Sequence, residues 1–335
     1  MAAIDVDALL APLSAAAPCG EDLGYDAAFL ALEEAARGKV EQQFGDTLIP
    51  AQDPDWRAMK EQSLALFTRT RDVRIAIHLL RALTRLEGSS GFCAAIKVVH
   101  GLLEQHWEGV HPTLDAEEND DATMRLNALA PLADGAIVLA DLRSAAVGAS
   151  RAGLTVRQIE LAFGKAEPHA GEPVPTTAGI TQALGTAAAQ SPGLLDELIA
   201  AHEAVRGVEA VIDRRAGAAE GPDLRALRAL TQSLAQAAQE VRGEAAGTAG
   251  AEGGESAGAA GAPRGAGGPI GSRDDAVKTL DRVCEWIERN EPTNPAPLLI
   301  RRAQRLMTKS FMDIIRDLAP DGLKDVERIA GTGGE

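Results

Sequence analysis

The chain has 335 residues, of which 45% are hydrophobic and 24% are charged, and its formal net charge is −16. This length allows about two domains and supplies enough apolar residues for a packed core. Nucleic-acid binding needs a basic surface, so the acidic balance argues against a nucleic-acid partner and favours a soluble protein. The cysteines, Cys19, Cys93 and Cys284, are far apart and form no CxxC pair. They indicate neither a disulfide framework nor a zinc site and are typical of a reducing cytosol.

No segment of the sequence indicates export or insertion into a membrane. The N-terminal stretch 1–17 has no basic beginning and is interrupted by Asp5 and Asp7, unlike a signal peptide. No stretch approaches the roughly 18 consecutive apolar residues of a membrane-spanning helix. We therefore expect a cytoplasmic protein without direct membrane insertion.

Helical periodicity is frequent along the chain and alternating runs of β-branched residues are nearly absent, so we predict an all-α fold. The first predicted domain, 1–150, holds most of the aromatic residues, which bury the most area per side chain. Helices are predicted over 56–67, 72–86 and 92–107, with a break at the GSSG segment 88–91. Short connections favour antiparallel neighbours, so this domain is expected to be a helical bundle.

The middle of the chain, 151–242, is predicted to form a helical hairpin. A proline-rich loop over 167–175 precedes one helix that starts at Ser191–Pro192 and another that starts at Gly221–Pro222. The segment 243–269 consists mostly of Gly and Ala, and it cannot bury enough apolar area to offset the entropy of ordering. We interpret it as a flexible, disordered linker.

The last predicted domain, 270–335, carries helical stripes of apolar residues, and its roughly 60 residues are marginal for an independent core. Self-association would complete that core, so we expect a small helical oligomerisation domain. The candidate interface residues are Val277, Leu280, Val283, Ile287, Leu298, Leu299, Leu306, Phe311, Ile314 and Ile315. A basic cluster of Arg301, Arg302 and Arg305 is a candidate surface for an acidic partner, although a solvated helix face is the simpler interpretation.

The remaining polar motifs predict no catalytic, cofactor-binding or metal site. His100, His106 and His111 do not have the i, i+4 spacing of ligands on one helical face. The acidic segment 115–121 lacks the glycine and the final glutamate of a calcium loop. The Pro18–Asp22 segment is interpreted as a structural wrap of the chain over the bundle rather than as a ligand site. Two alternatives stay open: a small helical hydrolase with an unrecognised active site, and a generic cytoplasmic adaptor.

Several separate short motifs occur along the sequence in an order that resembles the order found in one known family. Between Ala17 and Arg143 they are Pro18–Leu23 (PCGEDL), Gln42–Asp46 (QQFGD), Asp53–Arg57 (DPDWR) and Thr123–Leu129 (TMRLNAL). The C-terminal motifs are Arg282–Trp286 (RVCEW), Glu288–Pro292 (ERNEP), Pro297–Arg305 (PLLIRRAQR) and Asp317–Gly322 (DLAPDG). This arrangement resembles the TssA (ImpA) family of the bacterial type VI secretion machine, in its shorter class with a compact C-terminal domain.

The resemblance implies a cytoplasmic, non-enzymatic assembly factor without cofactors. Members of the family form ring-like homo-oligomers through the C-terminal domain, associate with the baseplate and the tube–sheath, and prime or coordinate their polymerisation. The family offers no catalytic residues to carry over. On this basis we expect the partners to be further copies of the chain and baseplate, sheath and tube proteins.

Overall fold

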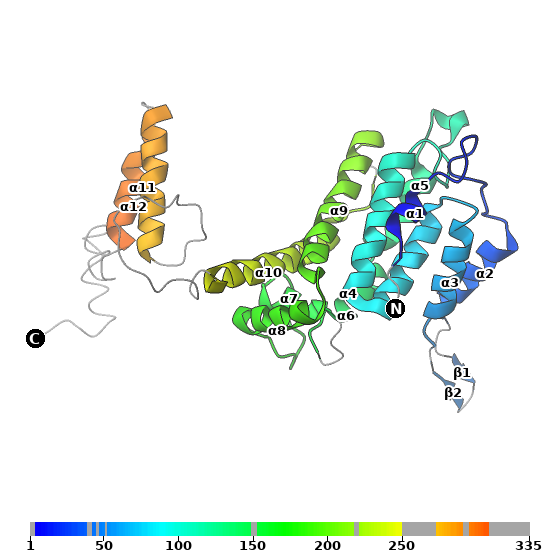
Figure 1. Cartoon of the computed structure of the whole chain (residues 1–335), viewed down its shortest axis with the longest axis horizontal. Helices are drawn as coiled ribbons and strands as arrows, with labels where there is room; N and C mark the ends of the chain where they lie inside the picture. The colour runs from blue at the N-terminus through cyan, green and yellow to red at the C-terminus, as the bar shows by residue number, and fades with distance from the viewer. Residues whose placement is uncertain are drawn as a thin grey trace, which may run out of the picture. The chain divides into compact units, whose positions relative to one another are not determined.

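The structure, a computed structural model, describes residues 4–38, 42–44, 47–50, 52–148, 153–217, 221–249, 273–290 and 295–307. The chain divides into two compact units, Met1–Glu255 and Ser256–Glu335, and each is described by itself. Apart from one short β-hairpin, the regular elements of the described residues are helices, so the all-α prediction is confirmed (Figure 1).

The first unit begins with α1 (Val6–Leu10), α2 (Ala27–Arg37), the antiparallel strands β1 (Gln42–Phe44) and β2 (Thr47–Ile49), α3 (Trp56–Phe67) and α4 (Val73–His106). It continues with α5 (Thr123–Leu129), α6 (Val138–Ser144), α7 (Val156–Ala162), α8 (Thr177–Gln190), α9 (Leu194–Arg215) and α10 (Arg225–Ala249). Single 3-10 turns lie at Ala116–Glu118 and Ala130–Leu132. The predicted bundle and the predicted helical hairpin are therefore both present, the hairpin as α9 and α10.

Helix α4 lies at the centre of the first unit, where it packs against α1, α3, α5, α6 and α9 (Figure 1). Asp72 caps its start by accepting a hydrogen bond at 2.7 Å from the amide of the second helical residue. The helix is interrupted at Gly88, whose φ of 68° and ψ of −148° lie outside the helical region. A Cβ at Gly88 would lie 2.4 Å from the Ala146 carbonyl oxygen. The predicted break is confirmed at this residue, and the three residues after it are helical.

One continuous apolar core runs through the first unit, from Leu10 in α1 to Ala238 in α10. Helix α9 joins the two ends of this core because it packs against both α4 and α10. His100 of α4 lies against Gly207 of α9, where a Cβ would come within 2.3 Å of the imidazole Nε2. The middle helices thus share their core with the N-terminal helices. The finer boundaries predicted at 150, 242 and 269 stay predictions.

Some elements of the first unit differ from the expectation. Helix α8 was not expected, because its Gly and Thr residues weaken the helical signal, yet Ile180, Leu184 and Ala187 are buried along it. The β-hairpin was not expected because strands of three residues are too short to show alternation. Helix α10 continues to Ala249, into the range 243–269 that the composition predicts to be flexible. The rest of that range lies outside the described residues.

The second unit contributes two described helices, α11 (Arg273–Asn290) and α12 (Ala296–Met307), which pack against each other. Helix α11 begins at Arg273 and ends at Asn290, two residues before Pro292. The rest of the predicted C-terminal domain, residues 308–335, lies outside the described residues. None of the helices that the structure describes is both long enough and apolar enough to cross a bilayer.

Candidate interaction site

The two helices of the second unit pack in antiparallel fashion around a small set of buried groups. The Cys284 side chain is fully buried, and its sulfur lies 3.9 Å from the Pro297 carbonyl oxygen. Near the other end, Gln304 Nε2 donates hydrogen bonds to the Val277 carbonyl and to Asp281 Oδ1, both at 2.9 Å. Early residues of α11 therefore pair with late residues of α12. These contacts fix which faces of the two helices point outward.

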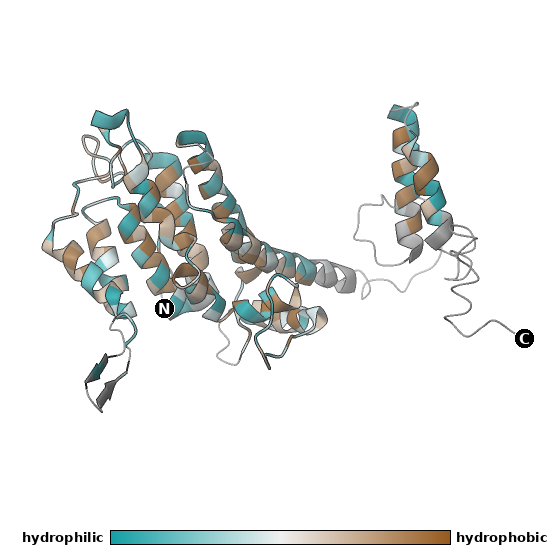
Figure 2. Cartoon of the chain, turned by 180° about the vertical axis from the view of Figure 1, so that it is seen from behind, coloured by the Kyte–Doolittle hydropathy of each residue, from teal (hydrophilic) through white to brown (hydrophobic). Residues whose placement is uncertain are grey.

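Large apolar side chains lie on the outward faces of this pair. Leu298 and Leu299 of α12 are 74% and 69% exposed, and Trp286 and Val283 of α11 are 56% and 41% exposed. Hydrophobic residues recur along both helices between hydrophilic ones (Figure 2). Exposed apolar clusters mark interaction sites in soluble proteins, and tryptophan is enriched among the residues that dominate binding energy. The pair therefore presents a candidate interaction site.

The predicted interface residues fall into three groups. Val283, Leu298 and Leu299 are exposed, whereas Val277, Leu280 and Ile287 are half-buried between solvent and the partner helix. Leu306 belongs to α12, and its side chain is not described. Phe311, Ile314 and Ile315 lie outside the described residues. Trp286 was missing from the prediction, although its position three residues after Val283 places both on one helical face.

The predicted basic cluster lies on α12. Arg301 and Arg302 are exposed, and Arg305 belongs to the helix without a described side chain. Arg301 forms an ion pair with Glu288 of α11 at 3.0 Å, so one of the cations is already paired within the chain. Exposed pairs of this kind contribute little stability, and a role of the cluster toward an acidic partner stays a prediction.

In the first unit, buried polar contacts hold the Pro18–Asp22 segment on the bundle. Thr70 Oγ1 donates a hydrogen bond to the Glu21 carbonyl at 2.7 Å. The backbone amide of Arg71 donates a hydrogen bond to the Cys19 carbonyl at 2.7 Å. The guanidinium of this residue, which is 3% exposed, holds the chain that precedes the segment by donating through Nη2 to the Ala11 carbonyl at 2.7 Å. A buried donor that binds backbone carbonyls anchors irregular chain. The prediction of a structural wrap is confirmed by these contacts.

Arg125 fixes the chain that follows α4 in the same way. This residue is fully buried, and its guanidinium donates to the carbonyls of Trp107, Val110 and Pro112. The guanidinium also stacks on the Trp107 ring, 4.8 Å from its centroid. Burial lowers the pKa of Arg125 to about 10, so the group stays charged at neutral pH. Its position in the sequence does not distinguish it from a surface arginine.

His106 and His111 of the first unit contact backbone carbonyls, and Cys19 and Cys93 are buried. Nε2 of His106 donates to a backbone carbonyl of the N-terminal segment at 2.7 Å, and His111 is buried with Nε2 at 3.3 Å from the Gly20 carbonyl. Burial raises the pKa of Cys93 to about 12. Burial also raises the pKa of Cys19, against the lowering effect of nearby guanidinium groups. Both thiols are therefore protonated at neutral pH, which is unfavourable for a nucleophile. Within the described residues no cluster of His, Cys, Asp and Glu could hold a metal ion.

These features define an all-α protein with an exposed apolar surface suited to contacts between proteins. The family described as ImpA, N-terminal, type VI secretion system matches residues 10–134. The chain is 36% identical over 353 aligned residues to the type VI secretion system component TssA1 of Pseudomonas aeruginosa, an alignment that covers 99% of this chain and 100% of that protein.

A solved structure leads to the same family. It contains the N-terminal domain, including the conserved ImpA_N region, of the TssA component of the type VI secretion system from Burkholderia cenocepacia. The similarity has a TM-score of 0.52 and 25% sequence identity and covers 73% of this chain and 96% of that one. The chain belongs to the TssA family, as its sequence motifs predicted.

Proposed function

We propose that this chain is a non-enzymatic structural component of a type VI secretion system. It forms a ring-like oligomer in the cytoplasm, associates with the baseplate and the tube–sheath, and primes or coordinates their polymerisation. The observation that carries the proposal is the relationship to TssA1, which extends over 99% of this chain.

The apolar surface of α11 and α12 supports self-association through the second unit. Trp286, Leu298 and Leu299 are more than half exposed in the single chain, and burying such side chains on association yields about 1.5–3 kcal/mol each. Two helices alone bury too little area for an independent domain. A second copy of the chain would cover the exposed side chains.

The distribution of charge also supports this division of roles. Ser256–Glu335 contains equal numbers of basic and acidic residues, so the whole formal charge of −16 belongs to Met1–Glu255. A neutral unit can approach its own copies without electrostatic repulsion, whereas an acidic unit is attracted to basic partner surfaces. We therefore assign oligomerisation to the second unit and contacts with other secretion proteins to the first.

Light scattering on the purified full chain tests the proposal. We expect a large, discrete multiple of the 34.9 kDa chain mass, and a lower-order species after removal of residues 270–335. In the full chain, the double substitution Leu298→Ala and Leu299→Ala should reduce the assembled mass. The matched control Glu285→Ala, which truncates an exposed polar side chain of α11, should not. A monomeric full chain, or a truncated chain that still forms the full assembly, would overturn the assignment.

A further inference from the structure

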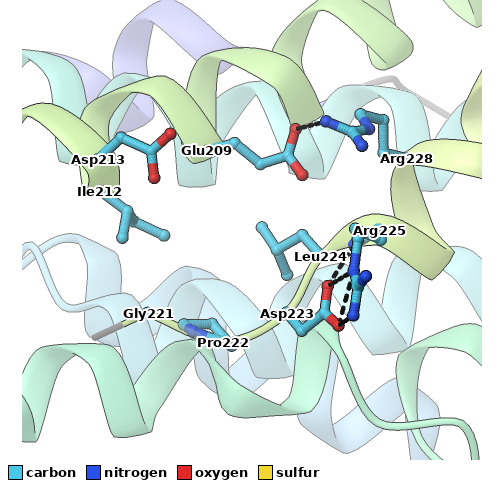
Figure 3. A pocket seen from close by; sticks show the side chains of 9 residues that line it. All are labelled: Glu209, Ile212, Asp213, Gly221, Pro222, Asp223, Leu224, Arg225 and Arg228. Atoms are coloured by element: carbon cyan, nitrogen blue, oxygen red, sulfur yellow. Dashed lines mark hydrogen bonds and ion pairs between the residues drawn. The ribbon is translucent and has the colours of Figure 1, made fainter. Parts of the chain in front are cut away.

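A cavity of about 390 Å³ lies where the C-terminal end of α9 meets the segment that leads into α10 (Figure 3). Its apolar part is formed by Ile212 of α9 together with Pro222 and Leu224 of the following segment. Ile212 and Leu224 are 3% and 2% exposed, so they present only a small apolar surface anchored in the core. A cavity with such a lining accommodates the methylene groups of a long side chain.

The polar rim of the cavity has an unequal balance of charges. The Asp223 carboxylate accepts three hydrogen bonds from the Arg225 guanidinium, at 2.8, 3.0 and 2.5 Å, and one from the Arg225 backbone amide at 3.1 Å (Figure 3). Glu209 Oε2 accepts a hydrogen bond from Arg228 Nη1 at 3.3 Å. Asp213, the third carboxylate of the rim, has no hydrogen bond or ion pair within the described part of the chain. The rim therefore carries one carboxylate more than its guanidinium groups neutralise.

Helix α9 adds to the negative potential of this rim. Glu209 and Asp213 are four residues apart on α9, so both lie on the helical face that borders the cavity. The cavity adjoins the C-terminal end of a helix of 22 residues, where the helix dipole favours a positive charge. Two basic residues of the last turn point elsewhere: Arg214 pairs with Glu104 of α4 at 2.8 Å, and Arg215 pairs with Glu108 at 3.0 Å.

We infer that this cavity receives the side chain of an arginine or lysine from a partner protein. The aliphatic part of that side chain lies on Ile212 and Leu224, and its cation binds between the carboxylates of Glu209 and Asp213. The surplus carboxylate, the helix C-terminus and the acidic character of the whole unit favour a basic occupant. The inference concerns the first unit and does not depend on ring formation by the second.

Methyl-detected NMR of the full chain, labelled at Ile, Leu and Val methyl groups, tests this inference. The probe is the capped tripeptide acetyl-Gly-Arg-Gly-amide, titrated in the millimolar range at constant ionic strength. We expect saturable shifts of the Ile212 and Leu224 methyl signals. The same peptide with citrulline in place of arginine has nearly the same shape without the charge, and it should leave these signals unchanged.

Three variants make the test specific. Asp213→Asn should weaken peptide binding about two- to fivefold, the range for a partly exposed charge pair. Glu209→Gln should weaken it further, because it also frees the Arg228 guanidinium to repel the ligand. The control Glu203→Gln removes the same charge from an exposed position of α9 outside the cavity and should leave binding unchanged.

Several results would overturn the inference. One is the absence of saturable shifts at Ile212 and Leu224 with the arginine peptide, and another is equal binding of the citrulline peptide. A third is a loss of affinity in Glu203→Gln as large as that in Asp213→Asn, since it would mean that general charge attraction explains the shifts. The methyl spectrum of each variant shows directly whether that variant is folded.

Discussion

The first unit and the helix pair α11–α12 differ in how deeply their leucine side chains are buried. Leu32 and Leu83 of the first unit are fully buried, whereas Leu298 and Leu299 of the pair are mostly exposed. Burial of such side chains supplies most of the favourable free energy of folding. The first unit therefore completes its core within one chain. The described part of the second unit leaves apolar area that only a further surface can cover.

This difference separates two properties that a single stability measurement would combine. Substitutions inside the first unit should change the free energy of unfolding, and substitutions on the outer face of α11 and α12 should change association. Trp56 and Trp107 belong to the first unit and Trp286 to the second. In a Trp286→Phe background, tryptophan fluorescence therefore follows the unfolding of the first unit alone.

Replacement of Arg125 should have the largest effect. Arg125→Ala leaves the carbonyls of Trp107, Val110 and Pro112 buried without their donor. Orphaned buried acceptors cost about 1–3 kcal/mol each, so we expect a loss of about 4 kcal/mol in urea unfolding of the Trp286→Phe background. The control Arg206→Ala removes an exposed arginine and should change stability by less than about 0.5 kcal/mol. A loss below about 1 kcal/mol for Arg125→Ala would contradict the anchoring role.

A pair of identical leucine substitutions tests the comparison of the two units directly. Leu32→Ala removes buried atoms and should lower the stability of the first unit by about 3 kcal/mol. Leu298→Ala removes the same atoms from an exposed position, so it should leave that stability unchanged and reduce the assembled mass in light scattering. If Leu298→Ala leaves the mass unchanged under dilution, the exposed leucine does not contribute to association.

Two glycines of the first unit should respond in opposite directions to alanine. At Gly88 the backbone lies outside the helical region and a Cβ would meet the Ala146 carbonyl, so Gly88→Ala should cost about 2 kcal/mol. At Gly243 in α10, an added Cβ would have no heavy atom of a neighbouring element within 4 Å. Gly243→Ala should therefore stabilise the helix by about 0.5–1 kcal/mol. Urea midpoints of the two variants measure this difference, and equal changes would contradict the structural reason given for Gly88.

Elements with strong local signals could be predicted from the sequence. The stripe of α3, with Met59, Ser63 and Leu66 buried, follows directly from helical spacing. Helix α8 could not be predicted, because its residues favour a helix only once α10 packs against them. The continuation of α10 to Ala249 could not be predicted either, because a Gly- and Ala-rich composition is compatible both with a flexible segment and with the end of a helix.

The candidate interaction site was predicted in part. Apolar spacing identified Leu298 and Leu299 as surface-forming residues, but it did not separate them from Leu280, which is half-buried. That distinction depends on the packing angle of α11 against α12. The buried role of Arg125 could not be predicted either, because its acceptors are backbone carbonyls that only the folded loop brings together.

The smallest expected effect concerns pH. His202 of α9 lies at the contact with α10, where its Nδ1 is 3.2 Å from Thr231 Oγ1. Burial lowers the pKa of His202 below its ordinary value of 6.5, as do the nearby Arg206 and Arg228, whereas Glu203 acts in the opposite direction. The unfolded chain therefore takes up this proton at a higher pH than the folded chain does.

The sign of the pH effect follows from this order of pKa values. Well above pH 6.5 both states are neutral at His202 and the residue has no effect on the pH dependence. As the pH falls below 6.5 toward the folded pKa, the unfolded state gains the proton first and stability decreases. His202→Gln should make this decrease shallower in urea unfolding at about pH 8, 6 and 5, whereas His169→Gln, at an exposed position, should not. An unchanged slope in His202→Gln would show that groups other than His202 cause the acid sensitivity of the first unit.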